Sequence, residues 1–248
     1  MRPFVAFVGV ALAVTRVDAQ QPDYDSMIAL RSSAGFRSAL EAAETSLSSD
    51  PADEVAAGVR ALVYGNAVDF LGMPPREARD AKERALARAL QVAPTNPWTR
   101  AAYGLIRRGD DPSGAERELT RCIEENPAFL DCYNLYGDLL RKTGHEEQAG
   151  AVYRRALQRW PGDGELLISY ALHLQETNNV DQAVVLLANL TREQPTFARG
   201  HWHLAVMLYE SNGDIGVARR EARRALELDP LIWNGERFLK ILDGVPDT

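Results

Sequence analysis

The stretch from Tyr133 to Pro161 reads YNLYGDLLRKTGHEEQAGAVYRRALQRWP. Large apolar residues recur at helical spacing in its first half, and small residues stand among large ones in its second half. Gly144 lies between the halves, and glycine tolerates the positive φ that commonly ends a helix. Pro161 closes the stretch, because proline cannot continue a helix. The stretch therefore predicts two helices joined by a short turn.

The same pattern returns along the chain at nearly constant intervals. The prolines that close successive units are separated by 33, 34, 34 and 35 residues, and they are Pro94, Pro127, Pro161, Pro195 and Pro230. In the unit from Leu130, small residues (Gly137, Ala149 and Ala156) stand where two helices must approach closely, because a larger side chain would overpack that contact. One pair of helices cannot bury its apolar face alone, so neighbouring pairs must stack.

This pattern resembles that of the tetratricopeptide repeat family. The positions that carry the resemblance in the clearest unit are Tyr133, Tyr136, Gly137, Ala149, Tyr153, Ala156 and Pro161. The resemblance is good over residues 97–229 and weak over 53–93. It implies an all-α, right-handed solenoid of roughly four to five helix pairs with a C-terminal capping helix.

The repeat pattern divides the chain into five parts. We expect a signal peptide at 1–19, a tail with degenerate opening helices at 20–52, a divergent repeat at 53–96, tetratricopeptide repeats at 97–230, and a capping helix and tail at 231–248. The divergent repeat is expected to have an enlarged first helix from Asp53 to Leu71 and a second from Pro75 to Val92. In the cap, the residues expected to cover the last repeat are Ile232, Trp233, Phe238, Leu239 and Ile241.

The first residues have the pattern of an export signal. Arg2 precedes an apolar run from Pro3 to Val14, and small residues follow at the positions that a signal peptidase reads. A membrane span needs about 20 apolar residues, so this run is too short for one. We expect cleavage after Ala19 and a periplasmic or secreted protein. The alternative is an uncleaved N-terminal segment that is buried in the fold.

The chain has two cysteines, Cys122 and Cys132, and each lies five residues from Pro127. If the two helices fold back about that proline, the cysteines come side by side. An exported protein can hold a disulfide, so the positions favour a Cys122–Cys132 bridge. The alternative is two buried free thiols that pack as small apolar residues.

Composition argues against several classes of function. The formal net charge is −7, which does not suit a protein that binds a nucleic-acid backbone or an anionic membrane. His201 and His203 are two residues apart, so on a helix they do not share a face and do not form a metal site together. No catalytic, phosphate-binding or haem-attachment motif is present, and we expect no enzyme activity, cofactor or metal.

The remaining candidate is the concave groove, which first helices line in the family. Matching positions in three consecutive units predict that its lining comprises Asp131, Asn134, Asp138, Arg141, Glu165, Ile168, Leu172, Gln175, Arg199, Trp202, His203, Val206 and Tyr209. One end is polar and the other is apolar and aromatic, which favours a protein or peptide partner. The alternative is that the N-terminal helices or the cap fill the groove. These positions lack the basic clamp with which some family members hold a terminal carboxylate.

The sequence thus predicts an exported, non-enzymatic scaffold or adaptor that binds a protein partner. The family resemblance suggests a process such as envelope assembly or secretion. The alternative function is a structural subunit that self-associates end to end, because the ends of solenoids can stack.

Overall fold

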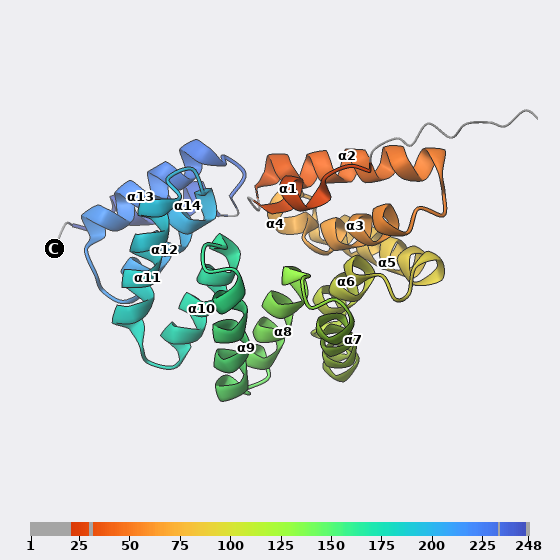
Figure 1. Ribbon diagram of the computed structural model, residues 1–248. Coiled ribbons are helices and arrows are strands. Elements are labelled where there is room, and N and C mark those ends of the chain that lie inside the picture. Colours follow the sequence, from red (N-terminus) through yellow and green to blue (C-terminus); the bar gives the residue numbers. More distant parts are fainter. Residues whose placement is uncertain (1–20, 30–31, 233, 247–248) are drawn as a thin grey trace, which may run out of the picture.

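The computed structural model describes residues 21–29, 32–232 and 234–246 (Figure 1). This part of the chain forms fourteen helices and no strand, which confirms the prediction of an all-α solenoid. The predicted signal peptide at 1–19 lies outside the described residues, and so does Trp233 of the predicted cap.

Four helix pairs form the regular part of the solenoid. They are α6 (Pro97–Arg107) with α7 (Pro112–Glu125), α8 (Leu130–Lys142) with α9 (Glu146–Arg159), α10 (Gly164–Glu176) with α11 (Val180–Glu193), and α12 (Ala198–Glu210) with α13 (Ile215–Leu228). Asp111, Asp163 and Asp214 cap the N-termini of α7, α10 and α13, because each side chain accepts a backbone N–H three residues ahead. Gly144 and Asn178 adopt positive φ in the turns, as helix C-termini require.

Close contacts between small and large residues join the two helices of a pair. A Cβ at Gly137 of α8 would lie 2.4 Å from the Tyr153 ring of α9. At Gly104 of α6 it would lie 2.5 Å from Leu119 of α7. These distances are far inside van der Waals contact, so only glycine permits this approach of the helix axes.

Five helices precede the regular pairs: α1 (Tyr24–Ala29), α2 (Ser33–Ser49), α3 (Glu54–Gly65), α4 (Ala67–Leu71) and α5 (Pro75–Val92). The single helix expected from Asp53 to Leu71 is wrong, because the chain breaks it at Asn66. Asn66 has φ −108° and ψ 13°, and its side-chain amide donates to the Leu62 carbonyl at 3.0 Å. The short helix α4 that follows packs against α2 and α5, and Gly72, at φ 65°, ends it.

The cap is helix α14 (Gly235–Asp243), which packs on α13. Leu242 is fully buried, and Phe238 and Leu239 pack against the core of the last repeats. Ile241 is 44% exposed, so the expectation that it covers the last repeat is wrong. Leu242, the next residue along, takes the inward position instead.

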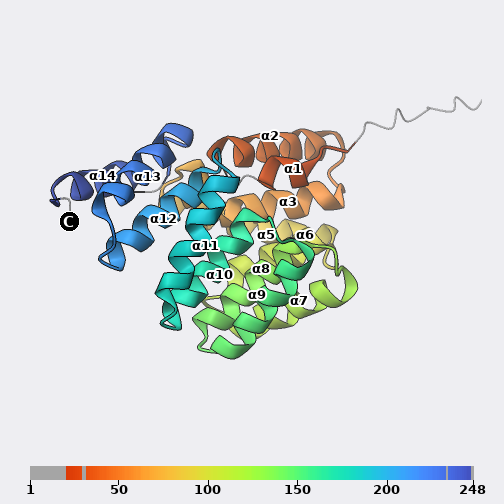
Figure 2. The same cartoon turned by 60° about the vertical axis from the view of Figure 1, so that its left-hand side comes forward.

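The solenoid curves until its two ends meet. In Figures 1 and 2 the N-terminal helices and α13–α14 lie on the same side of the molecule, and the middle repeats arch between them. The backbone N–H and the hydroxyl of Ser33, at the start of α2, both donate to Asp229 Oδ2 at 3.0 Å. Both residues are buried. The concave face is therefore enclosed on the open side by α2 and α4.

Candidate functional site

The concave face encloses a cavity of about 200 Å³, which we call the central pocket. Its lining comes from the first helices of successive pairs and from the N-terminal helices. The lining residues are Leu62, Asn66, Asp69, Phe70, Leu105, Arg108, Asp131, Asn134, Leu135, Asp138, Arg141, Lys142, Glu165, Leu172 and Arg199. Repeats in register place equivalent residues on one face, so side chains far apart in the sequence converge here.

The central pocket brings together many of the residues predicted to line the groove. Those are Asp131, Asn134, Asp138, Arg141, Glu165, Leu172 and Arg199. Matching positions in the repeats therefore identify a real concavity in the structure. That a partner binds there stays a prediction.

Two arginines in the central pocket are held by carboxylates. Arg199 of α12 forms a two-pronged pair with Glu165 of α10, at 2.9 and 2.8 Å. Arg141 contacts Asp138 at 3.5 Å and also pairs with Glu176. Burial works to lower the pKa of each arginine, but the neighbouring carboxylates outweigh it and hold the pKa above its usual value. Both guanidinium groups are thus fixed charges in the wall.

Other polar groups in this pocket have no partner among the described residues. Asn134 is 7% exposed, and its Oδ1 accepts no hydrogen bond. The Nε of Arg141 is also buried and unsatisfied. Arg108 and Lys142 form no ion pair within the described part of the chain, and burial, followed by the charge on Arg108, lowers the pKa of Lys142. The pocket therefore offers the Asn134 acceptor and several donors to a ligand, beside the carboxylates that line it.

A second cavity of about 190 Å³, the aromatic pocket, adjoins the central pocket. It is lined by Asp69, Phe70, Arg199, Trp202, His203, Asp229 and Ile232. Phe70 and Arg199 line both cavities, and the Arg199 guanidinium carbon lies 5.2 Å from the centre of the Phe70 ring. Burial, followed by the charge on Arg199, lowers the pKa of His203 to about 3. His203 is therefore neutral at physiological pH.

Several residues predicted to line the groove do not line the central pocket. Ile168 is 1% exposed and belongs to the core, so it does not line the groove. Trp202 and Tyr209 meet Phe238 of the cap edge-on, with ring centres 5.1 and 5.5 Å apart. Gln175 is half-buried and donates to Glu210 at 2.9 Å. Val206 is also half-buried and lines neither cavity. The cap and the N-terminal helices thus fill part of the groove, which is the alternative that the sequence left open.

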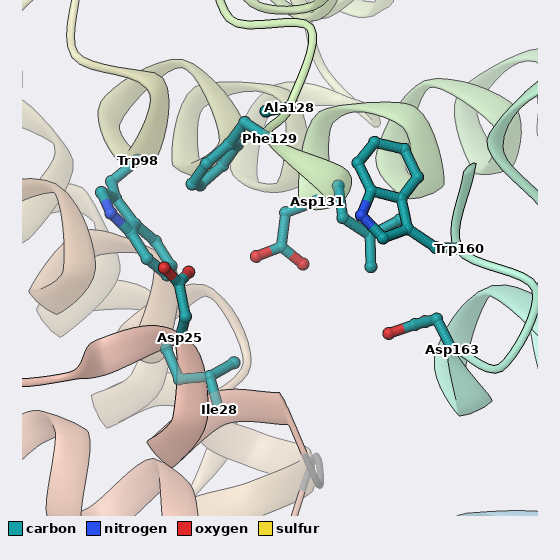
Figure 3. Close-up of a pocket in the computed structure, with 9 residues that line it drawn as sticks. Asp25, Ile28, Trp98, Ala128, Phe129, Asp131, Trp160 and Asp163 are labelled. Atoms are coloured by element: carbon teal, nitrogen blue, oxygen red, sulfur yellow. The ribbon is translucent and has the colours of Figure 1, made fainter.

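A third cavity, of about 250 Å³, lies at the turns between the repeats. Figure 3 shows Trp98, Phe129 and Trp160 around it, with Asp25 of α1 beside Trp98. Asp163 caps α10 by accepting the Leu166 N–H at 2.8 Å. Sequence reasoning missed this cavity, although an aromatic residue near each closing proline was a visible signal.

The structure joins Cys122 of α7 to Cys132 of α8 in a disulfide, as predicted, with the Cα atoms 6.2 Å apart.

In the described ranges, no three His, Cys, Asp or Glu residues are grouped so that they could hold a metal ion. His201 instead contacts Glu221 at 2.6 Å and the Pro195 carbonyl at 3.1 Å. None of the described helices is both long and apolar enough to cross a membrane.

Comparison with known proteins finds similarity to tetratricopeptide repeats in the middle of the chain. Residues 99–164 and residues 144–205 each match a family model described as a tetratricopeptide repeat. A TPR repeat-containing protein of Dictyostelium discoideum is 23% identical over 149 residues, which cover 57% of each protein. The chain therefore spans little more than half the length of this relative.

Solved structures show the same fold at low identity. A thermophilic TPR protein of Thermus thermophilus superimposes with a TM-score of 0.63 at 19% identity, covering 76% of this chain and 100% of that one. A monomeric mutant of human IFIT1, with Gppp-AAAA, superimposes with a TM-score of 0.65 at 16% identity, covering 83% of this chain and 49% of that one. At such identities the likeness concerns the fold alone.

Proposed function

We propose, from the premise that residues 99–205 of this chain are tetratricopeptide repeats, that the protein is a non-enzymatic scaffold that binds a protein partner at its central pocket. A scaffold of stacked helix pairs presents an extended concave surface, and such surfaces serve recognition. Trp and Arg, which are enriched among the residues that dominate protein interfaces, line the cavities of this surface.

The observation that carries the proposal is the unsatisfied Asn134 Oδ1 at the wall of the central pocket. A buried polar atom without a hydrogen bond costs about 1–3 kcal/mol, so native proteins rarely leave one. The unsatisfied Nε of Arg141 lines the same cavity. Because both atoms have almost no exposed surface in the free protein, a partner would satisfy them only by reorienting the two side chains as it binds.

We also propose export and a role in envelope assembly or secretion. The support is the sequence of residues 1–19, together with the Cys122–Cys132 disulfide, since disulfides persist in oxidising compartments. Cell fractionation with an antibody to the protein tests this. Export predicts a mature chain that begins at Gln20 and is found outside the cytoplasm.

A second candidate function is self-association end to end. The observation that favours it is the exposure of Leu231 and Ile241, at 43% and 44%, close to the C-terminal end of the solenoid. Light scattering over a range of concentrations separates the two candidates. A monomer at the highest concentration excludes self-assembly.

Charge reversal tests the proposed partner site. The site variant carries Arg108→Glu and Lys142→Glu, which line the central pocket and have no ion pair to lose within the described residues. The control variant carries Arg76→Glu and Arg79→Glu, which are exposed on the outer helix α5. Both variants change the net charge by the same amount, so a general charge effect cancels.

The wild type and both variants are immobilised, and proteins bound from an extract of the source cells are identified by mass spectrometry. We expect a set of proteins that the wild type and the control retain and the site variant loses. Equal capture by all three would contradict binding at the central pocket. Circular dichroism must show equal helicity for all three proteins.

A further inference from the structure

Helix α4 lies on the concave face and presents Phe70 to the last repeat. Phe70 is 6% exposed and is covered on both faces of its ring. One face stacks on Phe36 of α2, with ring centres 4.2 Å apart and planes within 3° of parallel. The Arg199 guanidinium of α12 lies over the ring at 5.2 Å. Phe70 therefore bridges the two ends of the solenoid.

We propose that α4 acts as an internal ligand, and that the partner of this protein competes with it by presenting an aromatic side chain preceded by an acidic residue. This inference rests on the proposed function, because it names the chemistry that the concave face recognises. The chain itself shows which chemistry fits. Its own Asp69–Phe70 pair lines both the central and the aromatic pocket.

The residues that surround Phe70 are arranged to bind an aromatic ring. Glu165 holds the Nε and one terminal nitrogen of Arg199, which fixes the plane of the guanidinium. A fixed guanidinium over a ring makes a favourable cation–π contact, and arginine suits this contact better than lysine does. Trp202 and Ile232 supply an apolar surround. An acidic residue before the ring would lie where Asp69 lies, beside the charge on Arg199.

The geometry of the contact between the two ends of the solenoid allows the ends to separate. Phe70 and Arg199 line two cavities, one of about 200 Å³ and one of about 190 Å³. A ligand that enters either cavity therefore meets Phe70 and Arg199. If the N-terminal helices move as a body, Phe70 stays stacked on Phe36. Opening then breaks the contacts of Arg199 with Phe70 and of Ser33 with Asp229.

A peptide that copies α4 tests the proposal. The probe is a fluorescein-labelled peptide with the sequence of residues 66–72, NAVDFLG, and its matched control is NAVDALG. Each is titrated by fluorescence anisotropy into the wild type and two open variants. Phe70→Ala removes the internal ligand, and Asp229→Ala removes the acceptor of Ser33 while leaving the Phe36–Phe70 stack intact.

We expect the NAVDFLG probe to bind at least tenfold more tightly to each open variant than to the wild type, and NAVDALG to bind none of them. Adding Arg199→Gln to either open variant should reduce the affinity for the probe at least tenfold. Equal affinity of the two peptides, or no binding by the open variants at millimolar peptide, would overturn the proposal. If Phe70→Ala fails to fold, the peptide titration with Asp229→Ala tests the proposal alone.

The outcome is separable from that of the charge-reversal experiment. Partner capture that depends on Arg108 and Lys142, together with no peptide binding, would leave the central pocket as the partner site and refute the internal ligand. Peptide binding without such capture would refute the central pocket as the partner site. Arg108 and Lys142 line only the central pocket, whereas Phe70 and Arg199 line both pockets, so the two experiments change different residues.

Discussion

At the scale of single residues, His203 on the concave face has a strongly lowered pKa. It lines the aromatic pocket beside Arg199, and burial together with that charge lowers its pKa to about 3. Its ordinary pKa is 6.5. As pH falls below 6.5 the unfolded chain takes up a proton here, whereas the folded chain does not until about pH 3. His203 therefore destabilises the fold progressively in acid.

We predict that His203→Gln weakens the pH dependence of stability. Between pH 7 and pH 4.5, the wild type should lose roughly 2 kcal/mol more unfolding free energy than the variant. Urea denaturation at the two pH values measures this loss. His145→Gln, which changes an exposed histidine in a turn, is the control. If the wild type and His203→Gln lose stability equally, the assignment of a buried neutral imidazole is incorrect.

We predict that Gly137→Ala destabilises the protein by about 1–3 kcal/mol, because the new Cβ would meet the Tyr153 ring. Gly162→Ala is the matched control, since a Cβ there meets nothing within 4 Å. Its effect should stay within about 0.5 kcal/mol. Urea midpoints measure both. Equal midpoints would show that the two helices of this pair can move apart without cost.

Residue-level prediction succeeded for Gly137 and failed for Ile168, for a physical reason. A small residue opposite a large one is a local property of one helix pair, and the sequence pattern reports it. Exposure on the concave face is not local. Asn134, Ile168 and Trp202 occupy the same position in three repeats, yet Asn134 and Ile168 are buried because other parts of the chain cover them. No pattern within a repeat carries that information.

At the scale of helices, the disulfide fixes the junction between two repeats. Cys122 lies near the end of α7 and Cys132 near the start of α8, and neither sulfur-bearing residue is exposed. The two helices belong to different pairs, so the bridge ties one repeat to the next. It does so at the position that symmetry about Pro127 predicted.

We predict that reduction of the disulfide lowers the free energy of unfolding by about 2–3 kcal/mol, because it releases a constraint on the unfolded chain. Urea denaturation with and without reductant measures the difference. The double variant Cys122→Ala and Cys132→Ala should not respond to reductant. Alkylation in denaturant without reductant should add no mass, and two added groups would show free thiols.

The break between α3 and α4 was not predictable from the helical pattern. Residues 53–71 are apolar at helical spacing throughout, and no proline marks the break at Asn66. Asn66 ends α3 by a side-chain hydrogen bond to the Leu62 carbonyl. The helix propensity of a residue does not include such a contact. This break places Phe70 at the wall of the central pocket.

At the scale of the whole molecule, the period of the repeats predicts a solenoid but not how far it closes. Small rotations from one pair to the next add up along the chain. Only their sum brings Ser33 to Asp229 and encloses the central pocket. Seven of the thirteen predicted groove residues line the central pocket, while the N-terminal helices that cover part of the groove could not be placed in advance.

The most direct measurement of the central claim is site-specific photo-crosslinking from inside the central pocket. Leu172, which lines the pocket, is replaced by a photoreactive phenylalanine, and Arg79 on the outer helix α5 is replaced in a control protein. After illumination in an extract of the source cells, adducts are sequenced by mass spectrometry. We predict a peptide of one partner protein attached at position 172 and not at position 79. The same adducts at both positions, or none at position 172, would contradict a partner site on the concave face.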